Sequence, residues 1–306
     1  MAAAPELAIR DSEFAGTFGV ARSDITPPPG IYARCWGSST HDIASGVHKP
    51  LLATCAVFAD ADGKNDLVLL ALDLSWWSSK QDELDLRTNI LKGSGLREQA
   101  LMLHPSHTHS APRTALEFVD RPGGHLIPQY RAQIKATCID LIAKARQSLA
   151  PATLTWRAGR CELAFNRDLV SPTDGRVLCG LNPSVHADET LLVGRVVNGA
   201  GKLRASLVNY ACHPISLGGG NTLVSPDYVG SMREIVEGAA EFTRGDDLHV
   251  LDHWTYLGTA QTEEELAVLA AKNADAAFDA GIYKILARYL AKNSKLDWLD
   301  LRGSGA

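Results

Sequence analysis

Apolar segments of strand length, separated by polar turns, open the chain. Residues 17–25, 51–59 and 66–74 are rich in apolar and β-branched side chains and are predicted as strands. Turn-forming residues at 61–65 separate the last two, which predicts a hairpin. Residues 26–30 contain three consecutive prolines and are predicted as a loop, because proline cannot donate to a sheet ladder.

Helical spacing follows in two segments. Residues 81–91 place apolar residues among charges, and Gly93, Ser94 and Gly95 predict where this helix stops. Residues 128–149 form the clearest predicted helix, because apolar residues recur there at i, i+3 and i+4. These residues are Ile134, Cys138, Leu141 and Ile142. The other predicted elements are a short buried strand at 100–104, strands at 153–158, 191–197 and 203–210, and helices at 228–239, 263–278 and 282–291.

Strands and helices alternate irregularly, with hairpins among them. This order favours an α/β fold in which mixed β-sheets are covered by flanking helices over a doubly wound parallel sheet. The 306 residues are 45% apolar and 21% charged, which is enough to build a sizeable core.

Net charge and targeting signals limit the partners and the cellular location that the sequence predicts. A net charge of −5 without any basic run argues against a nucleic-acid partner. No apolar stretch approaches the roughly 18 residues that span a bilayer, so no transmembrane segment is expected. Residues 1–14 do not read as a signal peptide, and the six cysteines lack a CxxC pair and read as mostly buried thiols. We therefore expect a cytoplasmic location.

Three of the ten histidines lie within six residues, namely His104, His107 and His109. If residues 106–110 are extended, His107 and His109 point to the same side, because alternate residues of a strand share a face. Two imidazoles at a strand end suit a divalent metal ion. The alternative is a polar loop that happens to be rich in histidine.

Other residues at strand ends carry candidate chemistry. His213 follows the predicted strand 203–210, and ligands of α/β proteins gather at such ends, although a lone histidine before proline also occurs as a hydrogen-bonded turn residue. Arg167 presents a fork of donors suited to a carbonyl or an oxyanion, or it is an ordinary surface residue. Asp227 precedes a predicted helix and could be its N-cap.

Six segments of the chain occur in an order that is typical of one family. They are residues 19–27, 46–51, 106–112, 165–167, 208–216 and 223–230. In this order they resemble the catalytic domain of the neutral/alkaline non-lysosomal ceramidases and their bacterial relatives. The resemblance implies a ceramidase-like N-terminal α/β domain over residues 15–240, followed by a diverged helical tail over residues 241–306 whose role is unassigned.

The resemblance also implies an activity. The family members are zinc-dependent amidases that hydrolyse the N-acyl bond of ceramide, so a lipid or small-molecule amide is the implied substrate. The resemblance implies His107 and His213 as zinc ligands. It implies that His109 contacts the substrate or the oxygen on the metal, and that Arg167 polarises the amide carbonyl. Amide hydrolysis needs both a polarised carbonyl and an activated water, and zinc can supply both.

Part of the family pattern has no counterpart in this chain. After the helix near Tyr228 the family has a loop with a serine close to the zinc, and later a carboxylate and a tyrosine ligand. Two histidines are fewer than the usual three protein ligands of a catalytic zinc. His249 and His253 would share a helix face if their segment is helical. The open candidates for a further ligand are Asp227, Asp246, His249, Asp252, His253 and Tyr256.

Three functions therefore stay open. The first is a ceramidase-like zinc amidohydrolase of sphingolipid metabolism. The second is a binding module that keeps the family fold and has lost catalysis. The third is a metal-dependent hydrolase of a small polar amide or ester. A ceramide enzyme needs an apolar docking patch, for which Trp76 and Trp77 are the candidate pair unless they belong to the core.

Overall fold

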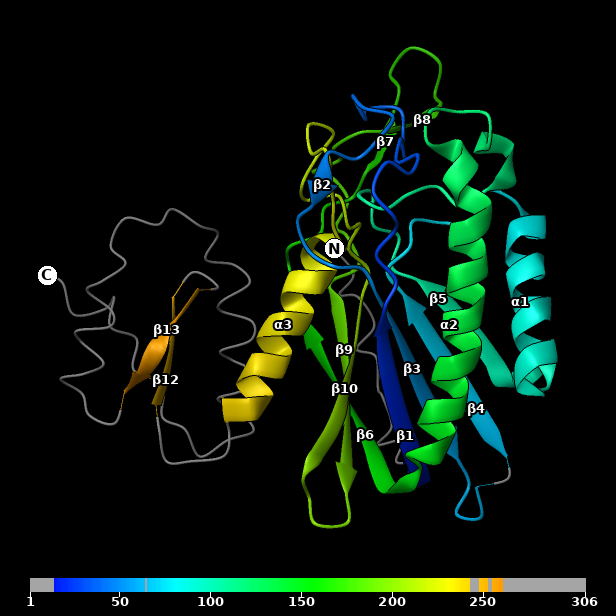
Figure 1. Ribbon diagram of the computed structural model, residues 1–306. Coiled ribbons are helices and arrows are strands. Elements are labelled where there is room, and N and C mark those ends of the chain that lie inside the picture. The colour runs from blue at the N-terminus through cyan, green and yellow to red at the C-terminus, as the bar shows by residue number, and fades with distance from the viewer. Residues whose placement is uncertain (1–13, 64, 243–247, 253–254, 261–306) are drawn as a thin grey trace, which may run out of the picture.

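A bent, mixed β-sheet forms the centre of the protein (Figure 1). The computed structural model describes residues 14–63, 65–242, 248–252 and 255–260. The sheet has seven strands in the order β10-β9-β6-β1-β3-β4-β5, in which β4 and β5 run parallel and the other described neighbours are antiparallel. The predicted α/β fold with a mixed sheet is confirmed. The strands are β1 (Phe14–Asp24), β3 (Leu52–Ala59), β4 (Asp66–Leu72), β5 (Leu101–Pro105), β6 (Ala150–Arg160), β9 (Thr190–Asn198) and β10 (Leu203–Tyr210).

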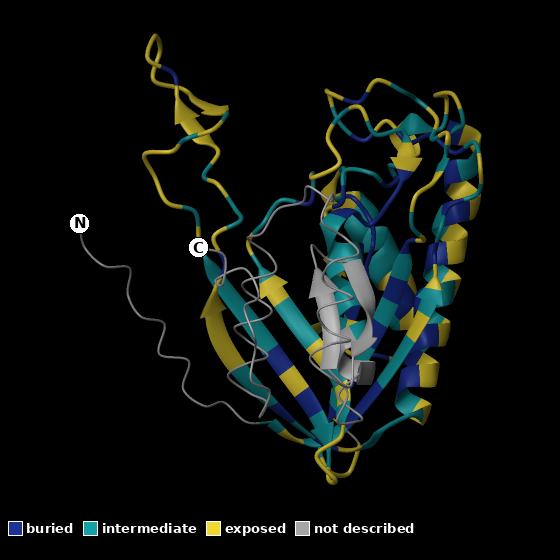
Figure 2. Cartoon of the chain, turned by 90° about the vertical axis from the view of Figure 1, so that its left-hand side faces the viewer, coloured by how far each residue is buried: buried dark blue, intermediate teal, exposed yellow. Residues whose placement is uncertain are grey.

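The sheet is bent because β1 shares its length between two partners. Residues 14–18 of β1 pair with β6, and residues 17–24 pair with β3. The two groups of strands consequently diverge from a common lower end as two arms (Figure 2). Strands β6, β9 and β10 form one arm, and β3, β4 and β5 form the other (Figure 1).

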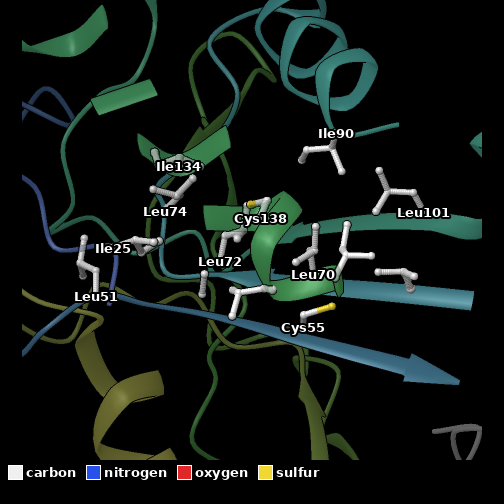
Figure 3. Packing of buried hydrophobic residues seen from close by; sticks show 14 of the residues in the cluster. Ile25, Leu51, Cys55, Leu70, Leu72, Leu74, Ile90, Leu101, Ile134 and Cys138 are labelled. Atoms are coloured by element: carbon white, nitrogen blue, oxygen red, sulfur yellow. The ribbon is translucent and has the colours of Figure 1, made fainter. Parts of the chain in front are cut away.

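Helices α1 (Lys80–Ser94) and α2 (Ile127–Gln147) cover one face of the sheet. Alternation along β3 sends Ala53, Cys55 and Val57 into the core beneath these helices, while Phe58 joins a smaller cluster on the other face. The four residues that predicted the helix at 128–149, Ile134, Cys138, Leu141 and Ile142, are buried in the main core, part of which Figure 3 shows.

Local sequence explains where α1 begins and ends. The Ser79 hydroxyl accepts a hydrogen bond from the Asp82 amide at 3.2 Å, which caps the helix. Gly95 adopts a left-handed conformation with φ of 68° and donates to Leu91 O. Gly93 and Ser94 still belong to the helix, so the predicted stop lies at Gly95.

A glycine allows α2 to approach the sheet closely. A Cβ atom on Gly19 of β1 would lie 1.9 Å from the carbonyl oxygen of Ala145 in α2. Any side chain here would therefore push the helix off the sheet.

Helix α3 (Asp227–Phe242) lies on the side of the sheet away from α1 and α2 (Figure 1). Arg233 forms a bidentate ion pair with the buried Asp73, which follows β4. Further ion pairs join Glu234 to Lys49 and Glu237 to Arg22. These contacts tie the helix to the sheet.

Three two-stranded ladders and three short 3-10 helices, at Glu98–Ala100, Leu116–Phe118 and Gly124–Leu126, complete the described secondary structure. The pair of β2 (Gly46–Val47) and β11 (Leu223–Val224) is parallel, whereas β7 (Asp168–Val170) with β8 (Val177–Cys179) and β12 (Leu248–Asp252) with β13 (Thr255–Ala260) are antiparallel. The helical alternative for the segment of His249 is wrong, because that residue lies in strand β12. The predicted helices at 263–278 and 282–291 lie outside the described residues.

The predicted strand at 100–104 exists, but it is not buried. It forms β5 at one edge of the sheet, where Met102 is 53% exposed. An edge strand has a partner on one side only, so alternate side chains reach solvent.

Two further expectations concern cysteines and membrane segments. All six cysteines are free and four of them are buried, as the sequence predicts. None of the helices in the described ranges has the length and apolar character needed to cross a bilayer.

Candidate metal centre

Two loops at the ends of β5 and β10 meet at the candidate site. Residues 106–110 follow β5, and residues 211–217 follow β10. The His109 amide donates to the carbonyl oxygen of Pro214 at 3.3 Å, which links the loops directly. One ring nitrogen from each of His107, His109 and His213 lies within 4.8 Å of the others. The structure thus brings together His107, His109 and His213, which are all candidate site residues in the sequence.

His107 and His109 converge for a different reason from the predicted one. Strand β5 ends at Pro105, and His107 has a φ of 65°, so residues 106–110 are not extended. The left-handed turn at His107 brings its ring to 5.2 Å from that of His109, centroid to centroid. A non-glycine residue in this conformation is strained by about 1–2 kcal/mol, and such strain is typical of functional sites.

Two tryptophans pack against the histidine rings. Trp76 lies 5.1 Å from the His107 ring and 4.9 Å from the His109 ring, and Trp36 packs edge-on against His109 at 5.0 Å. Trp76 is therefore part of the site, whereas Trp77 packs against the main core. Sequence reasoning missed Trp36, because a single tryptophan in a loop carries no spacing signal.

Burial and nearby charges favour the neutral form of all three imidazoles. Burial, followed by the charge of His213, lowers the pKa of His109 to about 4. Burial and then the Arg167 guanidinium lower the pKa of His213 to about 4, and the same two causes lower the pKa of His107. Neutral imidazoles keep the lone pairs that a metal ion requires.

A chain of contacts assigns the ring protons. Arg167 Nη1 lies 2.5 Å from His213 Nδ1, and a guanidinium can only donate, so His213 carries its proton on Nε2. This Nε2 lies 2.6 Å from His109 Nε2, which accepts the hydrogen bond. The remaining proton of His109 then lies on Nδ1, which is buried and has no hydrogen-bond partner among the described residues.

The three ring nitrogens form a donor set of the kind that holds a divalent metal ion. Two nitrogen ligands at the usual zinc distance on a tetrahedral ion are separated by about 3.3 Å. The 2.6 Å contact between His109 and His213 and the 4.8 Å limit for the whole group lie on either side of this value. Small ring displacements would therefore bring the nitrogens to metal distance.

Arg167 lies at the edge of the site. Its side chain is exposed and its segment directly precedes β7, where Nη1 also lies 3.9 Å from Cys179 Sγ. The Tyr210 hydroxyl accepts hydrogen bonds from the amides of Leu163 and Ala164. Strand β10 thereby positions both His213 and the segment that carries Arg167.

The other predicted ligand candidates are not brought to the histidines. Asp227 is buried, but its carboxylate accepts hydrogen bonds from the loop after His213 and lies outside the histidine group. Only the backbone is described for the strands that carry His249, Asp252 and Tyr256. Asp246 and His253 lie outside the described residues.

Solved ceramidases share this fold. The chain is similar to the neutral ceramidase from Pseudomonas aeruginosa, with 22% sequence identity, a TM-score of 0.57, and coverage of 75% of this chain and 37% of that chain. It is also similar to a ceramidase complexed with C2, with 21% identity, a TM-score of 0.56, and coverage of 74% and 36% respectively. The chain thus spans little more than a third of the length of these proteins.

A different similarity covers the C-terminal part. Residues 234–305 match the family described as the excinuclease Cho C-terminal domain. The match begins inside α3, whose Glu234 and Glu237 form ion pairs with the chain near the central sheet.

Proposed function

We propose that the protein is a metal-dependent hydrolase that uses zinc to cleave the amide bond of an N-acyl substrate such as ceramide. One observation carries the proposal. Three neutral imidazoles and a guanidinium converge at strand ends, in a fold that the neutral ceramidase shares. A lipid amide or a small amide is accordingly the proposed substrate.

The side chains divide the chemistry between them. When bound, zinc supplies polarisation of a carbonyl and a lowered pKa for water. His107 and His213 are the proposed ligands, and His109 is the proposed proton acceptor once its Nε2 no longer accepts a hydrogen bond from His213. Arg167 is exposed, so it can release His213 and turn its donors toward the substrate carbonyl. Trp76 limits the access of water to the rings.

Zinc analysis of purified variants tests this proposal. We expect about one zinc per chain in the wild type and none in the double variant His107→Ala, His213→Ala. His186→Ala is the matched control, because its side chain is 90% exposed, and should keep the zinc. Zinc retained by the double variant would contradict the ligand assignment.

Arg167→Ala separates the substrate role from the metal role. Because Arg167 acts on the substrate carbonyl, turnover of N-acyl substrates should fall while the zinc content stays unchanged. Equal losses of zinc and turnover would instead indicate a structural role. Comparing short-chain and long-chain N-acyl substrates distinguishes a ceramide enzyme from a hydrolase of small polar amides or esters.

A catalytically inactive binding module is the second candidate. The histidine group within the described residues contains no carboxylate. A wild-type protein that binds zinc and hydrolyses neither class of substrate would favour this candidate.

The match of residues 234–305 to an excinuclease domain supports a third candidate, contact with nucleic acid. We rank it last, because acidic residues outnumber basic ones in this segment and would repel phosphates. Anisotropy with labelled duplex DNA tests it. A Kd that rises with salt concentration, with log Kd linear in log salt, would favour the nucleic-acid candidate.

A further inference from the structure

The two histidine loops come from opposite edges of the seven-stranded sheet, so further contacts must fix them relative to each other. The first loop is fixed by Ser225. The Thr108 hydroxyl donates to the Ser225 carbonyl oxygen at 2.7 Å, and the Ser225 amide donates to the Ser110 carbonyl oxygen at 2.9 Å. Thr108 and Ser225 are both fully buried. The segment between His107 and His109 is thus anchored to residue 225.

The loop that carries His213 is fixed on both sides by the residues that follow. Before the histidine, the Tyr228 hydroxyl donates to the Cys212 carbonyl oxygen at 2.8 Å. After it, the Asp227 carboxylate accepts the Ser216 amide at 3.1 Å, the Ser216 hydroxyl at 2.6 Å and the Leu217 amide at 3.2 Å.

Asp227 does not behave as a simple N-cap. Its φ is 57°, a left-handed conformation that few non-glycine residues adopt, although aspartate adopts it more often than most, and it is only 3% exposed. Its one local hydrogen bond comes from the adjacent Tyr228 amide, whereas an N-cap side chain accepts from the second or third helical residue. The remaining hydrogen bonds go to the histidine loop. The Asp227 amide in turn donates to the Ser225 hydroxyl, which joins both anchors.

We propose that Asp227 is a positioning residue which, with Ser225 and Tyr228, sets the place of His213 relative to His107 and His109. The inference rests on the proposed function, in which these histidines bind a metal. In metal sites, the groups that orient the ligands typically affect affinity by about 10–100-fold when they are replaced.

Zinc affinity of full-length variants, measured by competition with a chromogenic chelator, tests the inference. In Asp227→Asn an amide group replaces one acceptor oxygen and opposes the loop amides, so we expect Kd to rise by about 10–100-fold. Tyr228→Phe removes one hydrogen bond and should raise Kd by less. Asp227→Asn with a Kd within about twofold of the wild type would overturn the inference.

Matched controls separate positioning from general loss of stability. Asp73→Asn alters another buried carboxylate, and Tyr130→Phe removes a similar hydroxyl bond, from Tyr130 to the Ile25 carbonyl oxygen at 2.7 Å. Both controls should lower Tm while leaving the zinc Kd unchanged. If the controls weaken zinc binding as much as the test variants do, the positioning role is refuted.

A measurement on the zinc-free protein keeps this inference distinct from the proposed function. The ¹⁵N imidazole spectrum should show His213 with its proton on Nε2 in the wild type, in Asp73→Asn and in Tyr130→Phe. In Asp227→Asn this signal should shift or broaden. A wild type that binds no zinc would refute the proposed function only, whereas an unchanged His213 signal in Asp227→Asn would refute the positioning role.

Discussion

The zinc affinity of this protein should depend little on pH between 7.5 and 5.5. The perturbation is a change of pH alone, and its effect depends on the proton affinity of the two proposed ligands. Zinc competes with protons for an imidazole, so acid weakens binding only as far as the free ligand becomes protonated. Because burial lowers the pKa of His213 to about 4, its ring stays neutral in this range, and the lowered pKa of His107 makes that ring harder to protonate than an ordinary imidazole.

The magnitude follows from the neutral fraction of each ring. An imidazole with an ordinary pKa near 6.5 is about nine-tenths neutral at pH 7.5 and about one-tenth neutral at pH 5.5, which weakens binding about tenfold. His213, with a pKa of about 4, stays more than about nine-tenths neutral and changes the affinity by less than about 1.1-fold. His107 adds less than tenfold, since its pKa is also lowered. Two ordinary ligands would together lose about 100-fold.

The assay is competition with a chelator whose own protonation is measured at each pH. We expect a total change in Kd below tenfold. In Trp76→Ala water reaches the rings of His107 and His109, so the pKa of His107 should rise and the pH dependence should steepen. A wild-type loss of more than tenfold would refute the reasoning, because it would show that the rings are not desolvated as the structure describes.

Two predictions concern the fold that carries the site, and urea denaturation measures both. Arg233→Met leaves the buried Asp73 without its cation and should cost about 3 kcal/mol, whereas Arg22→Met, which removes the more exposed pair with Glu237, should cost less than about 1 kcal/mol. Equal costs would contradict the assigned burial. Gly19→Ala places a Cβ against the Ala145 carbonyl and should destabilise by about 2 kcal/mol, while Gly199→Ala, with open space around it, should be nearly neutral. A neutral Gly19→Ala would refute the close approach of α2.

Periodicity predicted most of the described elements of this protein. The strands at 17–25, 51–59 and 66–74 and the helix at 128–149 appear within a few residues of their predicted bounds, since their apolar residues recur with the period of the element. The burial of β5 could not be predicted, because an apolar run does not reveal whether a strand has one neighbour or two.

Residue types at predicted strand ends also indicated the chemistry of the site. His107, His109, His213 and Arg167 were singled out by their residue types at predicted strand ends, and the structure brings all four together. The backbone geometry that brings them together could not be predicted from the sequence. Residues 106–110 were expected to be extended, but a left-handed turn at His107 aims the rings, and such a turn in histidine depends on tertiary contacts.

The sequence by itself determined which residues could act and which segments carry them, because residue type and periodicity are local properties. The tertiary structure alone decided the rest. It bent the sheet so that loops from its opposite edges meet, packed Trp36 and Trp76 against the rings, and made Asp227 an anchor for the His213 loop instead of a helix cap. The physical reason is that desolvation and contacts across more than a hundred residues of chain exist only after folding, and they set both the position and the protonation of the three imidazoles.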